Sequence, residues 1–189
     1  MSNMIYLAIV SDPNISEEQR KKEKEYKKYV DEHINNVRKI WEEMRNNKYI
    51  LDYFKEQSDS NLDWVLSTVD NLIYAHDTSK YGIVEWEAYR KNFYPVDEEE
   101  KESNRALFEK AWEHHYMNNL HHWDYWHATN SEDKMPLEFV IEMCCDWAAM
   151  SMKFGGNAYN WYKSQTDIVL GEKQQKWVVD ILKLFYGFE

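Results

Sequence analysis

The sequence predicts an all-α protein built as a bundle of helices. Glycine and proline are scarce, at 5 and 3 of 189 residues, which favours long helices and few tight turns. Apolar residues recur at alternating spacings of three and four along most of the chain, as in helices with one buried face. No repeat, low-complexity segment or linker interrupts this pattern, so we expect one domain over residues 1–189.

The helices can be placed from these apolar positions and from capping residues. The longest is predicted over residues 15–47, and its apolar face includes His33. Ser60, followed three residues later by Asp63, should cap a helix whose apolar stripe continues to His76. Further helices are expected at residues 48–57, 84–93, 97–118, 136–152, 158–164 and 172–186.

The helix expected at residues 136–152 is apolar almost all round, which is typical of the central helix of a bundle. The stretch 118–133 is polar and aromatic and should be irregular. Residues 6–10 form the only plausible strand, and no partner strand is evident for them.

The composition limits the partners that we expect. The formal net charge of −11 repels phosphate polymers, so an extended nucleic acid is an unfavourable partner. A small phosphorylated ligand stays compatible with this charge, because a few local lysines or arginines near a metal can reverse the field. The exposed aromatic residues would also allow a homodimer.

The two cysteines and the lack of long apolar runs bear on the compartment. Cys144 and Cys145 are neighbours, and adjacent cysteines rarely form a disulfide, so we expect buried thiols in a reducing environment. No run approaches the roughly 20 apolar residues of a membrane span. Residues 5–10 are too short for a signal-peptide core and follow no basic residue. We therefore expect a soluble, cytoplasmic protein that does not enter a membrane.

A set of histidines and aspartates on the apolar helix faces suggests a metal site. His76 and Asp77 stand side by side at a predicted helix end, where both can reach one cation. His33 and His115 also extend apolar stripes, and Asp146 lies in the middle of an apolar helix. A buried carboxylate is costly unless it is paired, and imidazole with carboxylate suits divalent transition metals. Each residue alone could instead be an ordinary core or surface group, with Asp146 paired to a lysine or arginine.

The order of these residues resembles the HD-domain superfamily of metal-dependent phosphohydrolases. The pattern of that superfamily is a histidine, then a His-Asp pair, then a distant aspartate, on a helical bundle. The resemblance implies an HD-like bundle with a metal site at its centre, whose ligands would be His33, His76, Asp77 and Asp146. Several stretches also resemble a small, uncharacterised bacterial and phage branch of it: HDTSK, YRKNFYP, AWEHH, NNLHHW and MPLEFVIEMCCDW.

Members of the superfamily with two metals have two further histidines between the pair and the last aspartate. His115 matches the first of them, and either His121 or His122 matches the second. We favour His122 as the metal ligand, on its position in the loop alone. Asp77 would then bridge the ions. The ligand types are compatible with one or two divalent ions of Mn, Fe, Ni, Co or Mg.

The resemblance implies a metal-dependent phosphohydrolase that acts on a small phosphate ester such as a nucleotide, by a metal-activated water. Its catalytic residues would be Asp77, Lys80 and His121. Lys80 lies four residues after His76 and would share its face if the helix continues. There it could neutralise a phosphate oxygen, unless it is a solvated surface residue.

Two basic residues on the next predicted helix, Arg90 and Lys91, could bind the substrate phosphate, although such residues are often plain surface charge. Two other functions share the same ligands. A few HD-fold proteins use a di-iron pair to oxidise substrates with oxygen, and a non-catalytic module stabilised by a metal is a third possibility.

Overall fold

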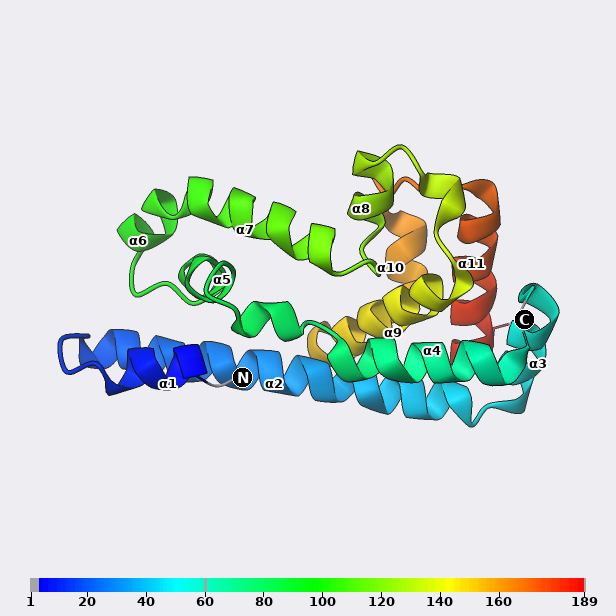
Figure 1. The fold of residues 1–189 in the computed structure, drawn as a ribbon, viewed down its shortest axis with the longest axis horizontal. Coiled ribbons are helices and arrows are strands. Elements are labelled where there is room, and N and C mark those ends of the chain that lie inside the picture. Colours follow the sequence, from blue (N-terminus) through cyan, green and yellow to red (C-terminus); the bar gives the residue numbers. More distant parts are fainter. Residues whose placement is uncertain (1–3, 60, 189) are drawn as a thin grey trace. The chain divides into compact units, whose positions relative to one another are not determined.

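A computed structural model describes residues 4–59 and 61–188. The model is 77% helical and contains no strand within those residues, which confirms the all-α prediction (Figure 1). The predicted strand at residues 6–10 is wrong, because this segment lies in helix α1 (Met4–Ser11). A single strand without a partner would leave its backbone groups unpaired, whereas a helix pairs them within the segment.

Most of the remaining helices agree with the sequence pattern to within two residues. Residues 48–57, 158–164 and 172–186 coincide with predicted helices. The helices that follow α1 are α2 (Glu17–Arg45), α3 (Lys48–Gln57), α4 (Leu62–Ala75), α5 (Trp86–Phe93), α6 (Glu98–Ser103), α7 (Arg105–Asn118), α8 (Trp123–Ala128), α9 (Leu137–Phe154), α10 (Ala158–Ser164) and α11 (Glu172–Tyr186), with short 3-10 turns η1 (Thr78–Tyr81) and η2 (Glu132–Lys134).

Two segments differ from the prediction. The helix expected at 97–118 is divided at Asn104, whose buried side chain donates a hydrogen bond of 2.7 Å to the carbonyl of Ala88. The stretch 118–133, expected to be irregular, contains α8. The predicted cap Ser60 lies outside the described residues, and Asn61 caps α4 by accepting a hydrogen bond from the Trp64 amide at 2.8 Å.

The chain divides into two compact units, which are described separately. Unit 1 holds the described residues up to Glu32 together with Asp77–Asn119, and unit 2 holds His33–His76 together with the chain from Leu120 onward. Helix α2 contributes its first half to unit 1 and its second half to unit 2. The single domain expected from the sequence stays a prediction.

In unit 1, α5 packs against α6, α7 and the turn η1. Its interior is polar as well as aromatic. The Trp86 indole donates a hydrogen bond of 2.6 Å to the buried Glu23, and the Tyr26 ring meets that indole edge-on.

In unit 2, α9 packs against α4, α10 and α11, and Figure 1 shows it lying against both α4 and α11. Ten of its residues are buried, as expected for a central helix. Cys144 and Cys145 are among them and are free thiols, in agreement with the sequence prediction. Within the described residues, no helix has both the length and the apolar character needed to cross a membrane.

The packing of α9 predicts the cost of opening a cavity in unit 2. Ile141 is fully buried on α9, whereas Met152 on the same helix is half-exposed. Ile141→Ala should lower the free energy of unfolding by about 2–5 kcal/mol, because the lost methyl groups leave an unfilled space. Met152→Ala is the matched control and should cost much less. Urea unfolding of both variants tests this, and equal losses would contradict the central position of α9.

Candidate metal centre

Three of the predicted ligands meet in unit 2. His33 comes from α2, His76 from the C-cap of α4 and Asp146 from the middle of α9. The His33 Nε2 atom lies 3.0 Å from Asp146 Oδ1 and 3.4 Å from His76 Nε2. The His76 Nε2 atom lies 3.8 Å from the same Asp146 oxygen. Two imidazole nitrogens and one carboxylate oxygen thus converge on a common point.

These separations fit a divalent ion. Two ligand atoms about 2.1 Å from a tetrahedrally coordinated ion lie roughly 3.4 Å apart. The three residues also form one of the groups whose ligand atoms all lie within 4.8 Å of one another. No lysine or arginine pairs with Asp146 in the described part of the chain, so its partners are histidines. The donor set of two nitrogens and one oxygen therefore suits a transition metal.

A residue that the sequence prediction missed, Glu142, orients this group. One turn before Asp146 on α9, its Oε1 lies 2.9 Å from His76 Nδ1 and 3.2 Å from His121 Nδ1. An ionised carboxylate can only accept, so His76 Nδ1 donates to Glu142. In the neutral ring this leaves the Nε2 lone pair for a metal ion, whereas a protonated ring donates from Nε2 to Asp146. A carboxylate that fixes the tautomer in this way is typical of histidines that bind metals. The spacing of four between two acidic residues on an apolar helix was the available signal.

The electrostatics of the two carboxylates agree with this arrangement. Burial alone would raise the pKa of Glu142, but His121 and His76 lower it to about 2. Burial would likewise raise the pKa of Asp146, but hydrogen bonds and charge from His33 and His76 hold it well below its usual value. Both shifts favour the ionised form of these carboxylates, which is the form that binds a metal or orients its ligands.

Two further predicted residues, Asp77 and His115, meet in unit 1. As at His76, one ring nitrogen of His115 contacts a glutamate and the other faces an aspartate. Glu85 is fully buried and accepts a hydrogen bond of 2.8 Å from His115 Nδ1, and the His115 Nε2 atom lies 3.3 Å from Asp77 Oδ1. Burial lowers the pKa of His115, but the charge of Asp77 and the hydrogen bonds to Asp77 and Glu85 raise it overall, against an opposing effect of Lys80.

The helix that carries His76 does not continue to Lys80. It ends at Ala75, and Asp77 follows in the left-handed region with φ of 57°. Lys80 lies in η1 and its ammonium group contacts Asp77 Oδ2 at 2.5 Å. It also lies 5.7 Å from the centre of the Tyr89 ring. Lys80 is therefore a positioned cation, held by the turn and not by a shared helix face.

The two residues predicted to bind substrate phosphate have other surroundings. Arg90 is fully buried in unit 1, with Nε 3.0 Å from Glu23 and both terminal nitrogens on Glu100 at 2.7 and 2.9 Å. Lys91 pairs with Glu87 on the surface of α5 at 2.6 Å. A buried guanidinium with two carboxylate partners favours a structural role for Arg90.

His121 and His122 lie together in unit 2, with ring centres 4.3 Å apart. His121 is buried and its ring centre lies 4.4 Å from that of His76. His122 is half-buried at the start of α8. Within unit 2, His121 is the one of the pair that contacts Glu142. The choice of His122 as the metal ligand stays a prediction.

Comparison with known proteins places the chain by family and no further. Residues 22–184 match the model of a family described as "Family of unknown function (DUF5662)", and the chain belongs to this family. No curated protein matches the chain, and no solved structure matches it.

The network of Arg90 predicts a test of its role. Arg90→Met should lower the free energy of unfolding by about 3–5 kcal/mol, because Glu23 would stay buried without its cation. Lys91→Met, on the surface of the same helix, should change it by less than about 0.5 kcal/mol. Urea unfolding of both variants measures this. If the Arg90→Met protein is as stable as the unmodified protein, the structural role is contradicted and Arg90 is again a candidate for binding the substrate phosphate.

The lowered pKa of Glu142 predicts how stability depends on pH. In the folded chain Glu142 keeps its charge down to about pH 2, whereas in the unfolded chain it protonates near its ordinary value of 4.5. The stability that the ionised Glu142 contributes to the folded chain is therefore complete above pH 4.5. It is lost as the pH falls from 4.5 to about 2. Glu142→Gln should flatten the acid side of the stability profile. Unfolding in urea with EDTA between these pH values tests this, with the exposed Glu56→Gln as control; an unchanged slope would contradict it.

Proposed function

We propose that this member of the family of unknown function is a metal-dependent phosphohydrolase that acts on a small phosphate ester. The observation that carries the proposal is the convergence of His33 Nε2, His76 Nε2 and Asp146 Oδ1, at 3.0–3.8 Å from one another. The order of these residues along the chain supports it, because it is the order of the HD-type metal ligands. The full HD-like set, including Asp77, His115 and His122, remains part of the proposal.

Each of the three ligands has a defined role in holding the ion. His33 and His76 supply neutral nitrogens, and Asp146 supplies a negatively charged oxygen that is already ionised. A divalent ion bound there would supply a water activated for attack on phosphorus near neutral pH. Three protein ligands would leave coordination positions for water and for a substrate oxygen.

The surrounding residues prepare the site. Glu142 holds the His76 ring in the tautomer that presents Nε2 to the ion, and so acts as a positioning residue. His121, held by the same carboxylate, is a buried imidazole that can contact a phosphate oxygen. In unit 1, Lys80 is fixed by Asp77, which directly follows His76 in the chain, and we assign it to neutralising charge on the phosphate.

The substrate class follows from the charge of the protein. A net charge of −11 opposes the binding of an extended polyanion but is compatible with the binding of one small phosphate ester at a metal ion. We place the activity in the cytoplasm, because the two buried thiols suit a reducing compartment.

Metal analysis of the purified chain tests the proposal. The protein should contain a divalent transition metal and hydrolyse at least one small phosphate ester in a screen with added Mn. His76→Ala and Asp146→Asn should each lower metal affinity by at least about 100-fold. Mutating a residue that only supports a ligand typically lowers metal affinity or activity by roughly 10- to 100-fold, and losing a ligand should lower affinity more. His127→Ala is the control, because this exposed histidine lies outside the cluster and pairs with Glu132.

Three results would contradict the proposal. Unchanged metal content in both ligand variants, with folding verified by circular dichroism, would remove the site. Metal binding without turnover across the phosphate panel would favour a non-catalytic module. Iron with oxygen consumption and no phosphate release would favour an oxygenase.

A further inference from the structure

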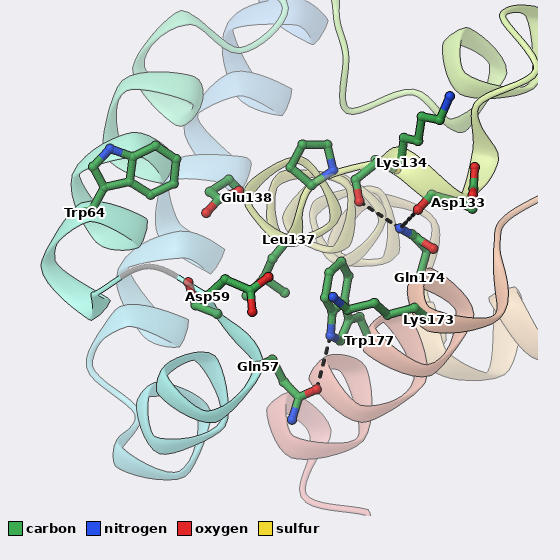
Figure 2. Close-up of a pocket in the computed structure, with 13 residues that line it drawn as sticks. Gln57, Asp59, Trp64, Asp133, Lys134, Leu137, Glu138, Lys173, Gln174 and Trp177 are labelled. Atoms are coloured by element: carbon green, nitrogen blue, oxygen red, sulfur yellow. Dashed lines mark hydrogen bonds between the residues drawn. The ribbon is translucent and has the colours of Figure 1, made fainter.

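Unit 2 contains a cavity of about 300 Å³ that the proposed activity does not use. It lies where the end of α3, the start of α4, the segment before α9 and the first half of α11 come together (Figure 2). Its apolar lining includes Met135, Leu137 and Trp177, which are all buried, and Trp64, which is half-exposed. The size is at the lower end of small-molecule sites.

The polar lining of this cavity includes a buried carboxylate without a partner. Glu138 lines the cavity, and the residue as a whole is only 7% exposed, so its carboxylate reaches solvent mainly through the cavity. It makes no hydrogen bond or ion pair with any other residue that the structure describes. Glu138 lies in the first turn of α9, where the helix dipole offsets part of the free-energy cost of burying its negative charge. A carboxylate that is buried and unpaired still favours a cation beside it.

A second carboxylate increases this preference. Asp59 points toward the side of the cavity where Trp177 and Lys173 lie, and Figure 2 shows Glu138 between Trp64 and Leu137. Asp59 also makes no ion pair within the described residues. The basic side chains do not neutralise them: the Lys173 ammonium group lies over the Trp177 ring at 4.6 Å, and Lys134 extends away.

The geometry favours an organic cation over a metal ion. Among the described residues, Asp59 and Glu138 belong to no group of three side chains that could hold a metal. The lining includes indole and aliphatic surface, which suits a hydrocarbon chain. The Lys173 ammonium group already lies over the Trp177 ring, so the indole that could contact a cationic nitrogen of a ligand is that of Trp64.

We propose that this cavity binds a small aliphatic amine, with a cationic nitrogen on the Glu138 carboxylate and the alkyl chain along Trp64, Leu137 and Trp177. The second carboxylate, Asp59, makes a diamine the best-matched ligand. This site shares no residue with the metal cluster and does not depend on the proposed hydrolase activity.

Isothermal titration calorimetry of the full chain with 1,4-diaminobutane tests the proposal. We expect saturable binding, weakened at least about tenfold by Glu138→Gln, because the charge-assisted hydrogen bond is lost. Trp64→Ala should weaken binding as well, and removes a half-exposed side chain whose loss the fold tolerates. Glu43→Gln, exposed on α2, is the matched control and should bind like the unmodified protein.

Two ligands of different charge and one further variant test whether the cavity selects a cation. Succinate and 1,4-butanediol, of similar length but negative or neutral, should not bind. Asp146→Asn should bind the diamine normally, so that failure of the metal site leaves this result intact. No saturable heat up to about 10 mM diamine, equal binding by Glu138→Gln, or equal binding of succinate would overturn the proposal.

Discussion

The enclosure of two carboxylates on one face of α9 is the constraint on which unit 2 depends: Glu142 is buried and the Asp146 side chain is 13% exposed. They lie one turn apart, and each has a lowered pKa, so each needs hydrogen-bond donors or a cation beside it. The partners are imidazoles from α2, from the end of α4 and from the segment before α8. Three separate parts of the chain are thus tied to α9 by polar contacts inside an otherwise apolar core.

In unit 1, buried carboxylates are also paired with an imidazole. His115 donates through Nδ1 to the buried Glu85 and faces Asp77 through Nε2, which repeats the order of atoms around His76. Arg90 is paired with two glutamates, Glu23 and Glu100, which favours a structural role for it. A cluster that presents a nitrogen to a second carboxylate can hold an ion, whereas a closed ion pair stabilises only the fold.

The sequence alone identified much of the candidate site, because the spacing of apolar residues on a helix can be read from a short stretch of sequence. His33 and His76 stood out because they continue apolar stripes, and Asp146 because it interrupts one. Glu142 was missed, although it lies on the same face one turn away, because a glutamate in a helix is usually solvated. The sequence did not show that Arg90 is buried, because its burial depends on Glu23 and Glu100, which come from other parts of the chain; its phosphate-binding role stays a prediction.

The sequence by itself determined the helical class, the boundaries of most helices and the central position of α9, since these follow from periodicity and capping within each segment. Only the tertiary structure decided which polar groups meet: that Glu142 orients His76, that Lys80 is held by a turn after the helix has ended, and that Glu138 faces a cavity without a partner among the described residues. Glu142 and His76 are far apart in the sequence, so their meeting depends on the packing of separate helices, and the Lys80 contact depends on where the helix ends. The energies of these contacts depend on burial and on the direction of individual hydrogen bonds, which no local pattern specifies.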